Sequence, residues 1–362
     1  MSSAVENKVA VLLDEAERRR ACAEPASRSM RAALERRRKR GTVVRPHRGV
    51  YARAEYWHAL TPDARDLHVM RALQRRRPEL VFCHESAALV WGLPVSYGRL
   101  GTIHTVSHDD GHPSRNQGIM RHRLPGDGEV TVREGLRVTG LVRTAFDCMR
   151  AMSFADALAV GDELLRKSTL SRREIRSRFI EMGKHARGCR RARGVLSYAD
   201  ARSESWAESA ARALAVTQGF AMPELQVELA QPSCPGSVYR VDHVWVRTDG
   251  TKVLGEVDGA QKYYDERMLK GKTSGQAILM ERQREAELTM YGMPVMRLSH
   301  ADVTDAERFT EKLTTYGISR RPEIVPVVRA LAKSNPDAAI SFTVVTVSDV
   351  LEVLAGSDLG HE

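Results

Sequence analysis

Three carboxylates lie close together in two short segments that have the pattern of neighbouring strands. Asp242 lies in VYRVDHVWV, and Glu256 and Asp258 lie in KVLGEVDG, after the turn-like RTDGTK. Alternate residues of a strand share a face, so Glu256 and Asp258 point the same way, and charges beside Val and Leu are costly unless paired. If Gly250 makes a hairpin turn, the three carboxylates converge, and such oxygen ligands suit Mg²⁺ or Mn²⁺. This pattern favours metal-assisted hydrolysis of a phosphodiester.

Further polar residues surround these carboxylates in the sequence. Glu208 lies on a preceding helix, either as a metal ligand or as an ion-pair partner of Arg212 one turn later. Lys262 follows the acidic strand and could stabilise charge that develops on the phosphate. Gln226 lies on the first strand of this region, on the face opposite its apolar neighbours. The candidate catalytic residues are Gln226, Asp242, Glu256, Asp258 and Lys262, and the candidate metal ligands are Glu208, Asp242 and Glu256.

The net charge of +10 and the pI near 9.5 favour an anionic partner. Residues 1–60 hold 14 Lys and Arg against 7 Asp and Glu, whereas residues 201–317 hold 14 against 17. We therefore expect a basic DNA-binding segment followed by an acidic module that holds a divalent metal ion. The candidate DNA-binding residues are Arg36, Arg37, Arg38, Lys39, Arg40, Arg45, Arg48, Arg282, Arg284 and Arg297.

Two helices and a β-hairpin are predicted at the start of the chain. One amphipathic helix covers 5–20, and a second begins at Ser27 or Ser29 and ends at Gly41 after ERRRKR. Two short β-like pieces follow, around Arg45 to Gly49. This order is typical of a winged helix-turn-helix, whose second helix enters the major groove of DNA. The alternative is an arginine-rich helix that only faces solvent.

The middle of the chain, 61–200, reads as mixed α/β and begins with a helix at 63–75. Its histidines fit no standard metal-binding spacing, so we expect structural or surface roles for His84, His104, His108, His112 and His122. Asp147 and Asp162 are expected to face solvent on helices. The stretch KHARGCRRARG at 184–194 is either a basic connector or a phosphate-contacting surface. Its glycines indicate flexibility, which makes it a candidate domain boundary.

The whole chain is predicted to be an α/β protein with four parts: a winged helix-turn-helix at 1–60, an α/β region at 61–200, a mixed sheet flanked by helices at 201–317 and an extension at 318–362. No window has the eighteen apolar residues of a membrane span, and the N-terminus lacks the pattern of a signal peptide, so a cytoplasmic location is expected. The five cysteines form no CxxC pair and are interpreted as reduced thiols.

Two resemblances follow from these motifs. The run ESAARALAVTQGF, PELQVEL, YRVDHVW, VLGEVDG, KYYDE and ERQREAELTMYGMPVMRLS resembles actinobacterial proteins whose C-terminal part is related to the very-short-patch repair (Vsr-like) endonuclease, a PD-(D/E)XK fold. The resemblance implies that Asp242 and Glu256 are metal ligands and that Glu208 and Asp258 lie near them. It also implies that Gln226 and Lys262 assist the reaction. It covers about 200–305.

RRRKRGTVVRPHRGVYA, VFCHESAALVWGLP and VTGLVRTAFDCMR are similar to the AbiEi antitoxin of the type IV abortive-infection system. That resemblance implies a winged-helix autorepressor in a phage-defence toxin–antitoxin pair, whose partner would be a nucleotidyltransferase-like toxin.

The sequence departs from the nuclease pattern at two points. The position two residues after the catalytic glutamate is usually Lys, and here it is Asp258, so Lys262 or another cation would have to substitute. The histidine nearest to the acids in the sequence, His243, is expected to face away from Asp242. We therefore expect a DNA-binding protein with an Mg²⁺- or Mn²⁺-dependent endodeoxyribonuclease domain. The alternative is an autorepressor or antitoxin with a degenerate nuclease fold.

Overall fold

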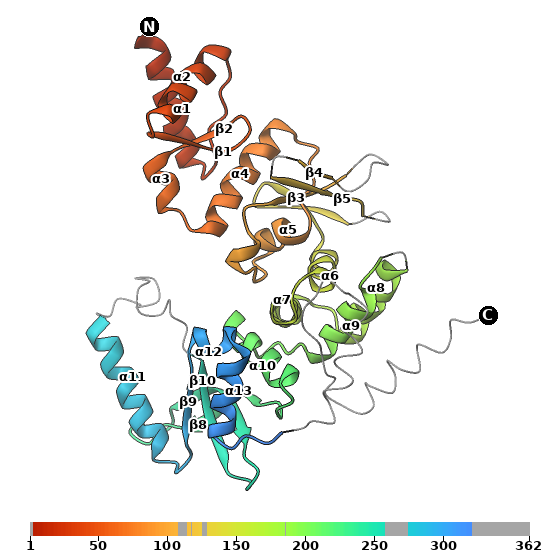
Figure 1. The fold of residues 1–362 in the computed structure, drawn as a ribbon, viewed down its shortest axis with the longest axis vertical. Coiled ribbons are helices and arrows are strands. Elements are labelled where there is room, and N and C mark those ends of the chain that lie inside the picture. The colour runs from red at the N-terminus through yellow and green to blue at the C-terminus, as the bar shows by residue number, and fades with distance from the viewer. Residues whose placement is uncertain are drawn as a thin grey trace, which may run out of the picture. The chain divides into compact units, whose positions relative to one another are not determined.

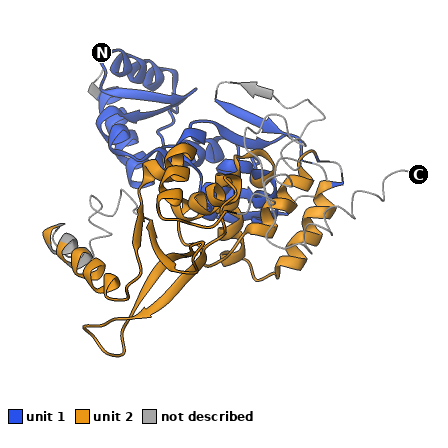
Figure 2. Ribbon diagram, turned by 60° about the horizontal axis from the view of Figure 1, so that its bottom comes forward, with its two compact units in different colours: residues 1–148, 184–186 blue, residues 149–183, 187–362 orange. Residues whose placement is uncertain are grey.

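The computed structural model describes residues 3–107, 114–116, 118–124, 129–184, 186–257 and 274–320 (Figure 1). The chain is a mixed α/β protein with small sheets. It divides into two compact units: unit 1 comprises residues 1–148 and 184–186, and unit 2 comprises residues 149–183 and 187–362 (Figure 2). Within the described ranges, every helix is too short or too polar to cross a lipid bilayer.

Unit 1 begins with the helices and hairpin that the sequence predicts: α1 (Ser3–Arg18), α2 (Arg28–Lys39), β1 (Val43–His47) and β2 (Val50–Arg53). The Ser27 side chain caps α2 by accepting a hydrogen bond from the Met30 amide at 3.2 Å. Gly41 follows the helix with φ +79°, a conformation that glycine adopts without strain. Leu13 of α1, Leu34 of α2 and Val43 of β1 share one small core. The predicted order of these elements is confirmed.

The rest of unit 1 combines short helices with two small sheets. The helices are α3 (Ala54–Ala59), α4 (Pro62–Arg76), α5 (His84–Trp91), the short 3₁₀ turn η1 (Tyr97–Arg99) and the first part of α6 (Leu141–Ala151). The strands are β3 (Ile103–Val106), β4 (Ser114–Asn116), β5 (Ile119–His122), β6 (Val130–Arg133) and β7 (Leu136–Thr139). One sheet has the order β3-β5-β4, and β6 pairs with β7. Met70, Phe82 and Val138 lie together in the hydrophobic core of this part of unit 1.

Unit 2 begins with helices: α7 (Phe154–Lys167), α8 (Arg172–Gly183), α9 (Cys189–Tyr198) and α10 (Trp206–Thr217). The stretch 184–194 is predicted from the sequence to be a basic connector or a phosphate-contacting surface, and the flexibility expected of it is wrong for its second half, which forms the start of α9. Arg191 of α9 is buried and donates to the carbonyl oxygen of Met152. An arginine of a basic stretch can therefore be buried when its guanidinium group finds a carbonyl partner.

Two aspartates that we expected to face solvent are buried instead. Asp147 is 0% and Asp162 1% exposed. Each is paired with an arginine, Asp147 with Arg143 at 2.7 Å and Asp162 with Arg212 at 2.8 Å. The helical period marks the apolar stripe, but it gives no sign that a polar residue beside the stripe will be covered by another helix.

A four-stranded sheet forms the centre of unit 2, in the order β11-β10-β9-β8. Its strands are β8 (Glu224–Ala230), β9 (Val238–Val246), β10 (Lys252–Val257) and β11 (Val295–Leu298), and its later helices are α11 (Ser274–Thr289), α12 (His300–Thr304) and α13 (Ala306–Thr315). The first three strands are antiparallel, and β11 lies parallel to β10. Gly250 has φ +84° at the β9–β10 turn, as predicted. Trp245 and Phe309 lie in the larger apolar cluster of the unit, and Leu254 and Leu288 lie in a second one.

Candidate functional site

Four of the predicted residues lie in one row across the sheet of unit 2. The strand pairs on either side place Gln226 of β8 opposite Asp242 of β9. One step beyond the last β9–β10 pair, Asp242 faces Glu256, and Glu256 pairs directly with Arg297 of β11. Directly opposite residues of neighbouring strands project to the same face of a sheet. The row therefore brings an amide, two carboxylates and a guanidinium together at one level.

The two carboxylates of the row are held by hydrogen bonds from different elements. Asp242 Oδ2 accepts from the backbone amide of Val257 at 2.9 Å. Glu256 is only 5% exposed, and its Oε1 accepts from Arg284 Nη2 of α11 at 2.8 Å. The same Arg284 nitrogen donates to the carbonyl oxygen of Arg240 at 2.8 Å. An arginine shared in this way fixes α11 over the acidic end of β10.

Glu208 joins the row from the first turn of α10. Ser205 caps this helix by accepting from the Glu208 amide at 3.1 Å. Glu208 Oε2 accepts from the Glu204 amide at 2.8 Å and from Gln226 Nε2 at 3.0 Å. Burial raises the pKa of Glu208, and the nearby charge of Asp242 raises it further. The carboxylate therefore lies beside the row, as predicted.

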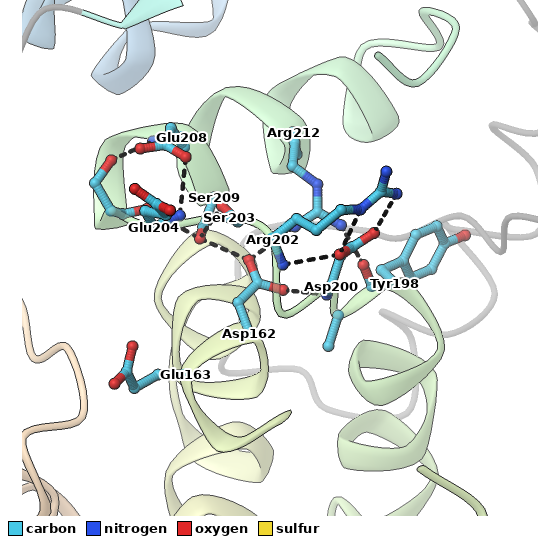
Figure 3. A network of polar contacts seen from close by, with 12 residues as sticks. Asp162, Glu163, Tyr198, Asp200, Arg202, Ser203, Glu204, Glu208, Ser209 and Arg212 are labelled. Carbon is cyan, nitrogen blue, oxygen red and sulfur yellow. Dashed lines mark hydrogen bonds and ion pairs between the residues drawn. The ribbon is translucent and has the colours of Figure 1, made fainter. Parts of the chain in front are cut away.

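The alternative partner of Glu208, Arg212, is occupied elsewhere. Arg212 donates to the carboxylate of Asp162 at 2.8 Å and to the carbonyl oxygen of Tyr198 (Figure 3). Asp162 also accepts from Ser209 Oγ at 2.7 Å. The predicted alternative of a Glu208–Arg212 ion pair is thus wrong. The buried network around Asp162 anchors α10, and because it engages Arg212, Glu208 can accept its hydrogen bond from Gln226 of the sheet.

Gln226 has an unusual backbone conformation for a strand residue. Its φ is +53°, in the left-handed region that residues other than glycine rarely adopt. Its Nε2 reaches Glu208, whereas its buried Oε1 has no hydrogen-bond partner among the described residues. Strained backbone and an unsatisfied buried oxygen both suggest that this residue serves a site.

His243 lies on the opposite face of β9, as expected from the alternation of a strand. Its ring is fully buried and packs edge-on against Trp245, with ring centroids 5.0 Å apart. Burial lowers the pKa of His243 to about 3, with a smaller contribution from the positive charge of Arg212. The imidazole is therefore neutral at physiological pH and takes no part in the row.

The other candidate residues of the nuclease module differ in their surroundings. Arg282 is exposed on α11, and Arg297 forms an ion pair with Glu285 at 3.5 Å. Asp258 and Lys262 lie outside the described residues. Their proposed roles stay predictions.

The N-terminal cations fall into two groups. Arg37 pairs with Glu6 at 2.7 Å, and Arg38 and Arg45 both pair with Glu35, at 2.8 and 3.0 Å. The second group forms no ion pair with any residue that the structure describes, and it consists of Arg36, Lys39, Arg40 and Arg48. Cations of the second group can bind phosphates without breaking an ion pair within the described part of the protein.

A second constellation in unit 1 was not foreseen from the sequence. Cys83, His84 and His122 each offer a ligand atom, and these atoms lie within 4.8 Å of one another. His104 Nδ1 lies 2.8 Å from His122 Nε2, and it lies 3.6 Å from a carboxylate oxygen of Glu85. Cysteine and histidine are the usual ligands of Zn²⁺, so the group could hold a metal ion.

The cluster depends on contacts that are distant in the sequence. His84 begins α5 with φ +48°, and the parallel pairing of β3 with β5 places the strand of His104 beside that of His122. The only signal in the sequence was the count of histidines between 84 and 122, two of which, His108 and His112, lie outside the described residues. Standard spacing patterns for metal sites describe ligands that are close in the sequence, and here Cys83 and His84 lie at the start of α5 whereas His122 lies on β5.

Comparison with known proteins gives two relatives and no domain assignment. No family model matches the chain. The uncharacterized protein MT2308 of Mycobacterium tuberculosis (strain CDC 1551 / Oshkosh) is 32% identical to it over 209 residues, which is 57% of this chain and 71% of the relative. The uncharacterized protein Rv2248 of M. tuberculosis (strain ATCC 25618 / H37Rv) matches with the same identity and the same coverage.

Proposed function

Since the chain belongs to the family of the uncharacterized mycobacterial proteins MT2308 and Rv2248, whose names state no activity, we propose a function from its own geometry. We infer that it is a DNA-binding protein whose second unit is a divalent-metal-dependent endodeoxyribonuclease. In this proposal the N-terminal helices and hairpin act as a winged helix-turn-helix, and the four-stranded sheet of unit 2 is a PD-(D/E)XK fold related to the very-short-patch repair endonuclease.

The row across the sheet carries this proposal. Asp242 and Glu256 project from adjacent strands at one level, and Glu208 and Gln226 meet at the end of the same row. Burial raises the pKa of Glu208, and the charge of Asp242 raises it further, so an ionised Glu208 beside the row would be stabilised by a bound cation.

The residues fit a hard divalent ion such as Mg²⁺ or Mn²⁺. Asp242 and Glu256 would hold it, with Glu208 beside them, because carboxylate oxygens are the ligands that these ions prefer. The unsatisfied Oε1 of Gln226 is a further oxygen at the same place. A bound ion would supply the positive charge that polarises a phosphodiester.

The cations near the row would act on the phosphates of DNA. Arg284 lies against Glu256 and a quarter of its side chain is exposed, and Arg297 is exposed to a similar extent. Guanidinium groups bind two phosphate oxygens at once and so orient the backbone. Gln226 would hold Glu208 in place through its amide. Lys262 is proposed to stabilise the charge that develops on phosphorus, where other members of the fold use the lysine replaced here by Asp258.

A nicking assay tests the proposal. Supercoiled plasmid incubated with the protein and Mg²⁺ or Mn²⁺ should be nicked, and Asp242→Asn and Glu256→Gln should each lower the rate roughly a hundredfold or more. Glu228→Gln, an exposed carboxylate of β8, is the matched control and should retain activity. The proposal would be refuted if neither ion supported nicking, or if both site variants nicked the plasmid at the rate of the parent.

One observation favours a second function, that of an autorepressor or antitoxin with a degenerate nuclease fold. Glu256 is already neutralised by Arg284, and Glu208 is already bound by Gln226. Such contacts allow the acids to persist without a metal ion. In this alternative the chain would bind its own promoter through α2 and the hairpin, and its partner would be a nucleotidyltransferase-like toxin.

Promoter binding separates the two functions. A regulator should bind a duplex from its own promoter more tightly than a scrambled duplex, and Asp242→Asn with Glu256→Gln should leave this difference unchanged. Equal binding of both duplexes would exclude the regulator. If a nucleotidyltransferase-like toxin is encoded next to this chain, rescue of cells that co-express it, by the double variant as well as by the parent, would favour the antitoxin.

A further inference from the structure

A basic cavity opens in unit 1 between α2, the β1–β2 hairpin, α4 and β5. Its volume is about 570 Å³. Glu35 of α2 and Tyr51 of β2 line one side, and Leu73 of α4 and Ile119 of β5 line another. This volume falls in the range of small-molecule binding sites, which extends over roughly 300–1,000 Å³. The cavity is separate from the row of acids in unit 2.

Positive charge dominates the wall of this cavity. Six arginines line it: Arg31, Arg45, Arg48, Arg76, Arg77 and Arg121. Glu35 is the one acid among the lining residues, and it already accepts hydrogen bonds from Arg38 at 2.8 Å, Arg45 at 3.0 Å and the Tyr51 hydroxyl at 2.9 Å. Six guanidinium groups against one carboxylate leave a formal charge of +5 around the cavity.

Most of these arginines have no counterion in the part of the chain that the structure describes. Within the described ranges, Arg31, Arg48, Arg77 and Arg121 form no ion pair and no side-chain hydrogen bond. Arg76 is different, because its Nη1 donates to the carbonyl oxygen of Arg48 at 3.0 Å and so supports the hairpin turn. Like charges gathered around a cavity repel one another, and a bound polyanion would remove that repulsion.

We propose that this cavity is a binding site for a nucleoside polyphosphate. Its arginines would hold the phosphates, because a guanidinium group binds phosphate oxygens in a bidentate manner. Leu73, Leu80 and Ile119 provide the apolar wall against which the nucleoside would lie. A duplex cannot enter a cavity of this size, although one of its phosphates could reach the rim. Arg45 and Arg48 belong both to the cavity and to the predicted wing, so ligand and DNA would compete for them.

The test is calorimetric titration of the full chain with ATP, without divalent metal. One ATP should bind per chain, and Arg77→Ala and Arg121→Ala should each weaken it about tenfold, equivalent to roughly 1.4 kcal/mol. Arg77→Lys keeps the positive charge but loses the bidentate guanidinium group, so it should reduce the affinity for ATP by less than Arg77→Ala does. Arg173→Ala, an exposed arginine of α8, is the control and should bind like the parent. Thermal melting would confirm that each variant is folded.

Three results would overturn the proposal. The first is the absence of ATP binding below millimolar concentration. The second is inorganic triphosphate binding as tightly as ATP, which would show that the nucleoside is not recognised. The third is a loss of duplex DNA binding in Arg77→Ala and Arg121→Ala without any ATP binding by the parent, which would assign the cavity to the DNA backbone. None of these results depends on nuclease activity, so the proposed function is tested separately.

Discussion

The two proposed functions give Glu256 different roles: it is a metal ligand in the nuclease and an ion-pair partner of Arg284 in the regulator. It lies opposite Asp242 in the row, and it receives the Arg284 guanidinium at 2.8 Å. If the site holds a metal ion, Arg284 and that ion compete for one carboxylate. If it does not, Arg284 is the permanent counterion of Glu256. If the site holds a metal ion, removing Arg284 should therefore strengthen the binding of that ion. If it does not, removing Arg284 should only leave Glu256 without its counterion.

Replacing Arg284 tests this competition directly. Arg284→Met should tighten Mn²⁺ binding roughly threefold to tenfold, because a hydrogen bond between charged groups no longer has to be broken. Asp242→Asn should weaken it. Calorimetric titration with Mn²⁺ would measure both, with Arg282→Met, an exposed neighbour on α11, as the control. Weaker Mn²⁺ binding by Arg284→Met would argue that the arginine does not compete with the ion.

The acid stability of unit 2 should depend on His243. Its pKa is lowered from 6.5 to about 3 in the folded protein, chiefly by burial. Between these values the unfolded chain binds more protons than the folded one, so the free energy of unfolding falls as the pH falls from about 6.5 to about 3. His243→Leu should lose less stability than the parent between pH 7 and pH 5 in urea denaturation. If His243→Leu and the parent lost the same stability between pH 7 and pH 5, the lowered pKa of His243 would be contradicted.

The same variant should be no less stable than the parent at pH 7. Neither ring nitrogen of His243 has a hydrogen-bond partner among the described residues, and the ring lies against Trp245. An apolar side chain of similar size leaves no unsatisfied polar atom. A large loss of stability at pH 7 would indicate that the ring makes a contact beyond the described part of the chain.

At the scale of elements, strand β10 depends on a close approach to β9. A Cβ atom added at Gly255 would lie 2.3 Å from a ring carbon of Trp245, which is fully buried. The glycine that precedes Glu256 is therefore required for packing rather than for backbone freedom. It allows the indole to cover the face of the sheet opposite the row.

Gly255→Ala should destabilise the protein by about 1–3 kcal/mol, the usual cost of overpacking a core. Gly275→Ala is the matched control, because the added methyl group has nothing within 4 Å and lies on α11. The control should be neutral or slightly stabilising, since alanine favours a helix. Denaturation in urea would measure both, and equal stabilities would refute the packing argument.

Local signals in the sequence predicted the elements well. The cap at Ser27, the stop at Gly41 and the turn at Gly250 each act within a few residues, so the sequence contains the whole cause. The partners of charged residues were not predictable in the same way. Arg212 and Asp162 lie on different helices, and their pairing depends on how α7 and α10 pack.

The candidate site was predictable in part for the same reason. Asp242 and Glu256 lie on strands joined by a short hairpin, so their register followed from the turn. The contact of Gln226 with Glu208 joins β8 to α10, and it needed the resemblance to a known fold. The cluster of Cys83, His84 and His122 had neither a local pattern nor a resemblance to indicate it.

For the whole molecule, net charge is divided unequally between the two units. Residues 1–148 and 184–186 hold 27 Lys and Arg against 17 Asp and Glu, which is +10, and the remaining residues hold 29 against 29. The entire net charge therefore belongs to unit 1. We expect unit 1 to supply most of the salt-dependent affinity for DNA, and unit 2 to contribute local contacts only.

A triple variant tests this division. Replacing Arg36, Lys39 and Arg40 by alanine should weaken duplex binding and reduce the slope of log affinity against log salt by roughly 0.9 for each phosphate that the protein no longer neutralises. These cations make no ion pair within the described residues, so the fold should persist. The control removes three exposed arginines of unit 2: Arg173, Arg178 and Arg190. Equal slopes for the two triple variants, measured by fluorescence anisotropy, would contradict the prediction.

The left-handed backbone at Gln226 has a consequence for how this family changes over time. Holding a residue with a side chain at φ +53° costs roughly 1–3 kcal/mol, and glycine would avoid that cost. Selection for stability alone would thus replace Gln226 by glycine, whereas selection for the row would retain it. Relatives that keep both acids should keep the glutamine, and relatives that have lost Asp242 or Glu256 should be free to accept glycine. The residue at position 226 of each relative would then indicate whether that relative still uses the site.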